Sequence, residues 1–310
     1  MSAVASHTPG RRPKPRRTAA VFAALAGFAL ATQGGAASGP IPRGAVRVPP
    51  KPQQQPTPMR VYAIDCGNIG VPDLSLFADT GNYDGLSITM SAPCWLIQHG
   101  KDWMLWDLGL GDDLNADPKG KVFFGLTFRV PHTLRSQLTQ LGLKPEDISY
   151  VGLSHLHADH VGNVGMFPRA TYFVSPTEVA WATGKPAPIG VLSNLAAAVA
   201  REKITPVPGD LDIFGDGSVV MISTPGHTPG HHSLVVKLPK AGKVIISGDV
   251  AHLEESYRLG LVPPINDNRA ETVASIARAK GLSANDPATV YIHHDMHVFE
   301  SLPKFPAYLE

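Results

Sequence analysis

The heptapeptide Ser-His-Leu-His-Ala-Asp-His, residues 154–160, directly follows the apolar run Ile148–Leu153, which has the composition of a buried β-strand. His155 and His157 are two residues apart, so in an extended segment their side chains project to the same side and can bind one ion. Asp159 and His160 follow at once, where a turn can direct them to a second ion. Imidazole and carboxylate donors suit zinc or a similar divalent metal, whereas calcium prefers oxygen ligands alone. The stretch therefore predicts a metal-binding loop at the end of a strand.

Three more potential donors stand at the ends of later β-rich runs. His227 lies in Thr-Pro-Gly-His-Thr-Pro-Gly-His, residues 224–231; Asp249 follows Val244–Gly248; His294 follows Val290–His293. A lone His beside Gly is usually a solvated turn residue, and an Asp after Gly often caps a helix. Four coincidences at strand ends are difficult to explain in that way, so we predict that these loops converge on one metal site.

The pattern of apolar residues predicts an α+β fold. Strands are expected at 60–65, 87–99, 103–108, 148–153, 171–175, 218–223, 233–238, 244–247 and 289–292, and helices from Leu134 to a stop at Gly142 and at 176–183, 191–201 and 269–280. Asn268 and Glu271 are spaced as a capping box for the last helix, and Gly281 is its expected stop. Mostly β-rich batches with interspersed helices predict two packed mixed β-sheets flanked by helices, an αββα sandwich.

The chain is expected to comprise three parts. Residues 1–37 have the order of an export signal: a basic stretch from Arg11 to Arg17, an apolar run from Ala19 to Ala31, and small residues. That run is shorter than the about 20 residues that span a bilayer, so a cleaved signal is favoured over an anchor, and no stable membrane span is expected afterwards. Whether the signal uses the general or the twin-arginine route stays open. Residues 38–58 are a Pro- and Gln-rich linker, and 59–310 are the folded domain of a periplasmic or secreted protein.

Charge and cysteine content limit the partners and the compartment. Residues 1–37 carry five Lys or Arg and no Asp or Glu, so their removal changes the formal charge from +1 to −4 (1 − 5). A mildly acidic protein is a poor partner for nucleic acid or an anionic membrane surface. Cys66 and Cys94 are the only cysteines. They either form a disulfide in an oxidising compartment or remain two partly buried thiols, and neither is expected to be a nucleophile.

The motifs together resemble those of the metallo-β-lactamase fold superfamily. The resemblance rests on residues 154–160, Gly226–His231, Ser247–Asp249 and the pair His294-Asp295. It implies a dinuclear centre with two Zn²⁺ or similar ions. One ion would be held by His155, His157 and His227, the other by Asp159, His160 and His294, and Asp249 would bridge them. His293 competes for the last place, but His294, directly before Asp295, fits the family's Gly-His-Asp pattern better, although the Gly of that pattern is replaced here.

The resemblance also implies hydrolysis of an ester-like or amide-like bond by a metal-bridging hydroxide, with Asp159 as a proton shuttle. Residues 91–100, 104–109 and 226–234 resemble most the N-acyl-homoserine lactonases, which open the lactone ring of quorum-sensing signals and thereby quench them. The alternative is another hydrolase on the same site, of β-lactamase or phosphotriesterase type. A metal-binding protein without catalysis is disfavoured because all seven ligand positions are filled, and a flavin-coupled diiron oxidoreductase because the chain has no room for a flavin domain. A homodimer is possible.

Two features bear on the substrate. The lactonases usually have a Tyr three residues after the bridging Asp, whereas this chain has His252. His252 either donates its N–H to the developing oxyanion or is a surface histidine at a helix start. The segment Val122–Phe128 carries three aromatic residues that either line a groove for an acyl chain, with Met166 and Phe167 as further wall, or pack in the core.

Overall fold

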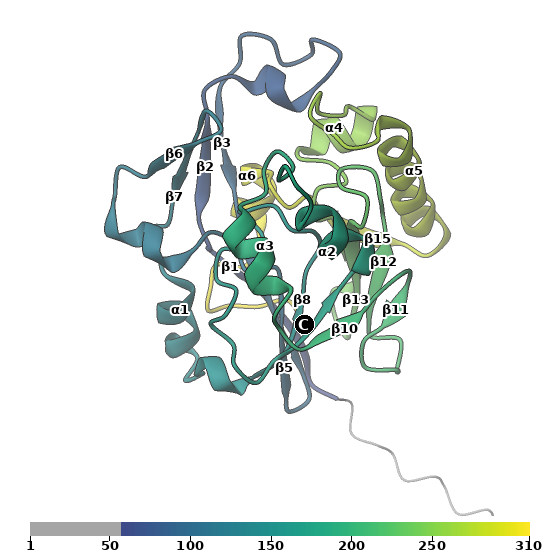
Figure 1. The fold of residues 1–310 in the computed structure, drawn as a ribbon. Helices are drawn as coiled ribbons and strands as arrows, with labels where there is room; N and C mark the ends of the chain where they lie inside the picture. Colours follow the sequence, from purple (N-terminus) through teal and green to yellow (C-terminus); the bar gives the residue numbers. More distant parts are fainter. Residues whose placement is uncertain (1–56) are drawn as a thin grey trace, which may run out of the picture. The chain divides into compact units, whose positions relative to one another are not determined.

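The computed structural model describes residues 57–310, so the predicted export signal and nearly all of the predicted linker lie outside the described residues. Three β-sheets form the described part of the chain (Figure 1). Within this range, no helix has both the length and the apolar character to cross a membrane.

The first sheet has six strands in the order β1-β4-β5-β8-β9-β10, and the last four of these run parallel. Its strands are β1 (Met59–Ile64), β4 (Cys94–His99), β5 (Asp102–Trp106), β8 (Ile148–Gly152), β9 (Thr171–Val174) and β10 (Ile204–Pro206). The second sheet has the order β11-β12-β13-β14-β15. Its strands are β11 (Leu211–Asp212), β12 (Val219–Ser223), β13 (His232–Leu238), β14 (Gly242–Ile246) and β15 (Ala288–Tyr291).

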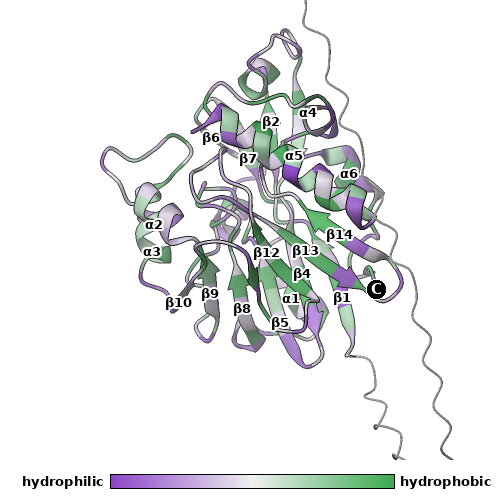
Figure 2. Ribbon diagram, turned by 90° about the vertical axis from the view of Figure 1, so that its right-hand side faces the viewer, coloured by the Kyte–Doolittle hydropathy of each residue, from purple (hydrophilic) through white to green (hydrophobic). Residues whose placement is uncertain are grey.

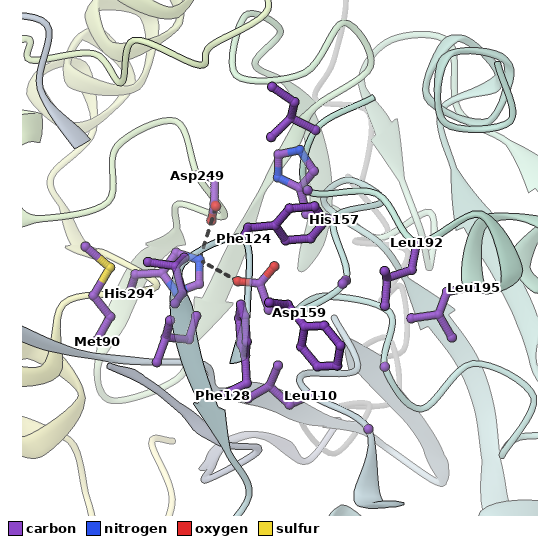
Figure 3. A pocket seen from close by; sticks show the side chains of 18 of the residues that line it. Met90, Leu110, Phe124, Phe128, His157, Asp159, Leu192, Leu195, Asp249 and His294 are labelled. Atoms are coloured by element: carbon purple, nitrogen blue, oxygen red, sulfur yellow. Dashed lines mark hydrogen bonds and ion pairs between the residues drawn. The ribbon is translucent and has the colours of Figure 1, made fainter. Parts of the chain in front are cut away.

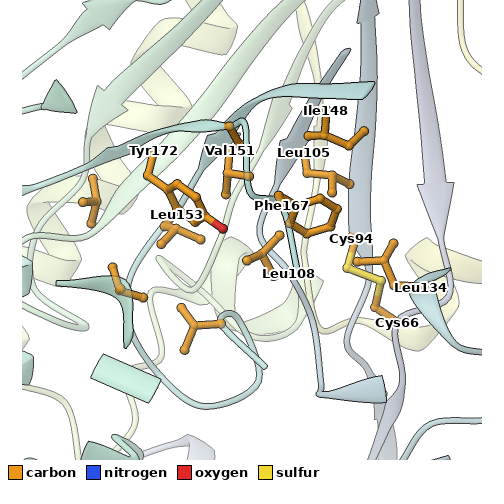
Figure 4. Packing of buried hydrophobic residues seen from close by; sticks show 14 of the residues in the cluster. Cys66, Cys94, Leu105, Leu108, Leu134, Ile148, Val151, Leu153, Phe167 and Tyr172 are labelled. Atoms are coloured by element: carbon orange, nitrogen blue, oxygen red, sulfur yellow. A yellow bond between two sulfur atoms is a disulfide. The ribbon is translucent and has the colours of Figure 1, made fainter. Parts of the chain in front are cut away.

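The two sheets pack face to face, and helices cover their outer faces. The α-helices are α1 (Leu134–Gln140), α2 (Pro176–Ala182), α3 (Ser193–Val199), α4 (Glu254–Leu259), α5 (Arg269–Asn285) and α6 (Met296–Ser301). Trp95 and Met104 of the first sheet pack against Met221 and Leu234 of the second. On the other face of the first sheet, a second core joins the strands to α1, α2 and α3 (Figure 4). The strands carry most of the apolar residues in Figure 2, and the predicted αββα sandwich is confirmed.

Three of the predicted elements have different boundaries in the structure. The expected strand 87–99 is two strands in different sheets, β3 (Ile88–Ser91) and β4, because Pro93 between them has no N–H to donate. Helix α5 continues through Gly281 to Asn285 and ends where Asp286 precedes Pro287, a residue that disfavours helix in its predecessor. Helix α3 is also shorter at both ends than the predicted 191–201.

A third, four-stranded sheet was not predicted. It has the order β3-β2-β7-β6 and contains β2 (Asn68–Val71), β6 (Lys121–Phe123) and β7 (Leu126–Arg129) in addition to β3. The predicted acyl-groove segment 122–128 forms its β6–β7 hairpin. Three short 3₁₀ helices, η1 (Leu74–Phe77), η2 (Asp112–Ala116) and η3 (Pro145–Asp147), complete the connections.

Of the two states left open for the cysteines, the structure has the disulfide. Cys66 and Cys94 are bonded, with their Cα atoms 5.6 Å apart, and both are buried (Figure 4). A Cβ on Gly109, whose φ is +56°, would lie 2.2 Å from the Cβ of Cys66. Only glycine fits there without displacing the bridge.

Candidate metal centre and substrate cavity

The loops that carry the predicted donors meet at one edge of the sandwich. The loop 154–160 leaves the end of β8 in the first sheet, whereas His227, Asp249 and His294 follow β12, β14 and β15 of the second. Parallel strands such as β14 and β15 present their carboxyl ends at the same edge, which explains the convergence. The site therefore joins the two sheets.

One donor group consists of three imidazoles. His157 Nδ1 lies 3.0 Å from His155 Nε2 and 3.0 Å from His227 Nε2. The three ring nitrogens are close enough to hold one metal ion. His155 is fully buried, and Ser154 Oγ lies 3.0 Å from its Nδ1.

The second donor group combines two imidazoles and a carboxylate. Asp159 Oδ2 lies 3.9 Å from His160 Nε2 and 3.6 Å from His294 Nε2, and the two Nε2 atoms are 3.2 Å apart. The Nδ1 atoms of His160 and His294, on the other side of each ring, contact further residues that orient the rings. His160 Nδ1 lies 3.0 Å from the buried Asp107, and His294 Nδ1 donates to the carbonyl oxygen of Ser91.

Asp249 lies between the two groups. Its Oδ2 is 3.7 Å from His155 Nε2 and 3.5 Å from His227 Nε2. It is 3.1 Å from His294 Nε2 (Figure 3). Its Oδ1, which is buried, has no hydrogen-bond partner among the described residues. A buried carboxylate oxygen without a partner is costly, and coordination of a cation would satisfy it. The donor set therefore fits a divalent metal.

The electrostatics differ between the two groups. Burial and the neighbouring imidazoles hold the pKa values of His155 and His227 well below the usual range, and burial lowers that of His157 to about 4. These three rings are therefore neutral at pH 7, which is the form that binds metal. The pKa values of His160 and His294 are raised in spite of burial, because Asp249 and other carboxylates face them.

Of the two histidines that the sequence placed in competition, His294 lies with Asp159 and His160, whereas His293 lies with Asp107 and His160. His293 points to the rear of the site instead, where its Nδ1 is 4.0 Å from Asp107 Oδ2. Both ring nitrogens of His293 are buried without a hydrogen-bond partner among the described residues.

His252 is at the site and not on the surface. Only 4% of the residue is exposed, and its Nε2 lies 3.4 Å from Asp249 Oδ2. The ring is held edge-on by Phe77, with centroids 4.9 Å apart, and is stacked on His294. The interpretation of His252 as an exposed histidine at the start of a helix is therefore wrong.

A cavity of about 310 Å³ opens beside the donors, and His252 lines it. Asp159 lines it as well (Figure 3). Its apolar wall comes from the third sheet, the η1 segment and the loop before α3, and includes Ile69, Leu76, Phe77, Met90, Leu110, Phe123, Phe124, Leu126, Phe128, Ile189, Leu192 and Leu195. The hairpin 122–128 thus contributes to the wall as expected. Met166 and Phe167 do not. Phe167 is buried in the core between the first sheet and its helices (Figure 4), and the partly buried Met166 packs against that core.

Sequence reasoning missed two supporting carboxylates, Asp107 and Glu178. Asp107 is fully buried and has a φ of +56°, an uncommon backbone conformation for a residue other than glycine. Glu178 in α2 is also fully buried, and burial raises its pKa to about 7. Asp107 lies within the quoted motif 104–109, which was a signal for it; no local pattern marks Glu178.

The chain belongs to the metallo-beta-lactamase superfamily, whose sequence pattern matches residues 89–294. It is similar to the N-acyl homoserine lactonase AttM of Azorhizobium caulinodans, with 29% identity over 265 residues that cover 82% of this chain and all of the relative.

Solved structures have the same fold. An N-acyl homoserine lactone hydrolase with the product N-hexanoyl-L-homoserine bound at its catalytic metal center has a TM-score of 0.71 and 22% identity, over 82% of this chain and all of that one. AidC, a dizinc quorum-quenching lactonase, has a TM-score of 0.62 and 20% identity, over 82% and 91% of the two chains.

Proposed function

We propose that the protein is a dinuclear zinc hydrolase that opens the lactone ring of N-acyl-homoserine lactones. The observation that carries the proposal is the placement of two donor groups on either side of Asp249, at the base of an apolar cavity. The lactonase names of the relatives support the choice of substrate. His155, His157 and His227 would hold one ion, Asp159, His160 and His294 the other, and Asp249 would bridge them.

Two bound divalent ions would supply Lewis acidity and would lower the pKa of a water molecule so that it can attack near neutral pH. The water oxygen adds to the lactone carbonyl carbon, the ring C–O bond breaks, and the ring oxygen leaves as a hydroxyl group. Asp159 is 17% exposed at its side chain and lines the cavity, so its carboxylate can take the proton from the water and deliver it to the leaving oxygen. His252 would donate an N–H to the carbonyl oxygen as negative charge develops there.

The cavity supports an acyl-chain substrate. Its wall is mostly apolar, and the donor residues His157, Asp159, His227, Asp249 and His294 line the same cavity. An N-acyl-homoserine lactone has the matching division into a polar lactone head and an apolar chain. Burial of each methylene group contributes about 0.8 kcal/mol, so binding should strengthen with chain length until the cavity is filled.

We further propose that the protein acts in the periplasm or outside the cell, after cleavage of residues 1–37. The Cys66–Cys94 disulfide supports this proposal, because structural disulfides persist in oxidising compartments. Cell fractionation and N-terminal sequencing of the mature chain test it. A full-length protein in the cytoplasm would contradict it.

The experiment that tests the activity is metal analysis combined with a panel of lactones of increasing acyl length. We expect two metal ions per chain and ring opening that becomes more efficient with longer chains. An absence of turnover across the panel would rule the lactonase out. Cleavage of nitrocefin or paraoxon far above that of every lactone would assign the site to the alternative hydrolases.

A further inference from the structure

Glu178 is a buried carboxylate that belongs to neither donor group. It lies in the first turn of α2, with none of its surface exposed. Among the described residues it forms no ion pair with a Lys, Arg or His. A carboxylate with no countercharge is costly to bury, so its hydrogen bonds must explain its presence.

Both carboxylate oxygens accept hydrogen bonds from the backbone of ligand-bearing loops. Oε1 accepts from the N–H of Leu156, which stands between His155 and His157, at 3.0 Å. Oε2 accepts from the N–H of Gly230, in the loop that carries His227, also at 3.0 Å. One side chain therefore connects the loop from the first sheet to the loop from the second.

The packing around Gly230 shows how closely α2 approaches that loop. A Cβ at position 230 would lie 2.5 Å from the backbone nitrogen of Glu178 and 2.6 Å from its Cβ. These distances are shorter than real Cβ contacts, so the approach requires glycine. The next residue, His231, accepts a hydrogen bond from the N–H of Asp249 at 2.9 Å, which continues the connection toward the carboxylate between the two groups.

The second donor group has separate supports. His160 is held by Asp107, and His294 by the carbonyl oxygen of Ser91, at 2.7 Å. Neither contact involves Glu178. The two donor groups thus have different carboxylate supports, although they share Asp249 and the hydroxyl of Ser154, which lies 3.0 Å from His155 Nδ1 and 3.3 Å from His160 Nδ1.

We infer that Glu178 is a positioning residue for the three-histidine group alone, and that it sets the metal affinity of that half of the centre. This inference rests on the proposed dinuclear centre. Residues that orient metal ligands typically change metal affinity by about 10- to 100-fold when they are replaced. Glu178→Gln retains the shape of the side chain but replaces one of the two acceptor oxygens with an NH₂ group, which cannot accept the second backbone N–H.

The test is a titration of metal-free protein with Co²⁺ at pH 8, followed by its visible absorption spectrum and by metal content after gel filtration. For Glu178→Gln we expect one ion to bind as in the unchanged protein and the other to bind about 10- to 100-fold more weakly. The absorption bands of the more weakly bound ion should reappear at high Co²⁺ concentration, because the site is then filled. Asp107→Asn should show the opposite selectivity: it should lower the affinity for the ion held by Asp159, His160 and His294.

Two controls separate this role from a general loss of structure. Glu146→Gln makes the same chemical change at an exposed residue of η3 and should leave both binding steps unchanged. Thermal unfolding of the metal-free variants shows whether each is folded during the titration. Equal affinity of Glu178→Gln and the unchanged protein for both ions would overturn the inference, and so would equal weakening of both. A single ion in the unchanged protein would instead overturn the dinuclear centre itself.

Discussion

Asp249 is the residue on which the proposed centre depends most. Its carboxylate lies within 3.7 Å of ring nitrogens of five histidines: His155, His160, His227, His252 and His294. Asp249→Ala should reduce the metal content below two ions per chain and lower kcat/KM by at least about 100-fold, because both ions lose a shared ligand. Elemental analysis and lactone turnover measure the two effects.

The control for this substitution is Asp286→Ala. Asp286 has a side chain that is 70% exposed and pairs with Lys243, so its removal should change neither quantity. Retention of two ions and full activity by Asp249→Ala would show that the bridging assignment is wrong.

The contribution of His252 can be isolated by replacing the ring with one of similar shape. His252→Phe keeps the contact with Phe77 but removes the N–H, so kcat should fall by about 10²- to 10³-fold while KM changes little. His252→Gln retains a donor and should recover part of the loss. Steady-state kinetics on one lactone suffice, and an unchanged kcat in His252→Phe would exclude the oxyanion role.

The sequence predicted the seven donors but not the residues that hold them. His155, His227 and Asp249 could be predicted because each lies in the loop after a β-rich run, and strand ends meet at one edge of a sheet. Asp107 acts on His160 across 53 residues, and Glu178 acts on Leu156 across 22, so no local spacing reveals either contact. Phe167 was misplaced for the opposite reason: it is near the donors in sequence, but its side chain turns into the core.

At the scale of single elements, the β6–β7 hairpin is the most unusual feature of the cavity. Phe123 pairs with Leu126, so Phe124 and Gly125 form a two-residue turn in which both have positive φ, +52° and +78°. Asn-Gly is the preferred sequence for such a turn, and a bulky residue at the first position is strained. Phe124 is nevertheless 52% exposed and lines the cavity, where we expect it to contact the acyl chain of the proposed substrate.

Phe124→Asn should therefore raise stability and weaken substrate binding together. We expect unfolding to require about 1 kcal/mol more free energy, from relief of the left-handed strain, and KM to rise for long acyl chains but not for short ones. Urea denaturation and KM across the lactone panel provide the measurements. The matched control is Val122→Asn, since Val122 is 67% exposed on the same hairpin and does not line the cavity. A lower stability or an unchanged KM would contradict the interpretation.

The predicted strands correspond mainly to strands of the two large sheets, whereas the strands of the third sheet were not predicted as separate elements. The strands β8, β12 and β13 were found because each presents at least five β-rich residues in sequence. In the third sheet, β2 contains Gly70 and β6 has only three residues, all exposed, so neither carries a local signal. These strands form because they pair with β7 and cover a separate apolar cluster that includes Ile69 and Phe128.

For the molecule as a whole, the disulfide should be a major contribution to stability. It joins the segment after β1 to the first residue of β4 across 28 residues, a loop whose closure stabilises a fold by about 3 to 4 kcal/mol in the chain-entropy model. Because both sulfurs are buried, the test is the double variant Cys66→Ala/Cys94→Ala and not mild reduction. Its urea midpoint should fall accordingly, with activity retained at low temperature. An unchanged midpoint would show that the bridge is dispensable.

Acid should destabilise the metal-free protein. Burial holds six imidazoles at lowered pKa: His155, His157, His227, His231, His232 and His293, with His157 at about 4 and His231 at about 3. In the unfolded chain these groups bind protons below about pH 6.5, whereas the folded protein resists protonation, so stability is lost as pH falls from 6.5 toward 4. The raised pKa values of His160 and His294 act in the opposite direction but are fewer.

The measurement is the thermal midpoint of chelator-treated protein between pH 7.5 and 4.5. We expect the midpoint to decrease steadily below pH 6.5. The underlying loss is in the free energy of unfolding, up to about 1.4 kcal/mol per pH unit for each neutral imidazole. His231→Gln removes one such group and should reduce the slope. A midpoint that is constant or rises on acidification would contradict the prediction.

The division of the donors between the two sheets determines when the protein can acquire its metal. Three histidines and Asp159 come from the first sheet, and His227, Asp249 and His294 from the second, so the complete set exists only after the sheets have docked. A chain exported unfolded would therefore take its ions from outside the cytoplasm, and a chain exported folded would take them from within. If residues 1–37 act as the proposed export signal, the choice between the general and the twin-arginine route would therefore select the pool from which the metal ions are taken.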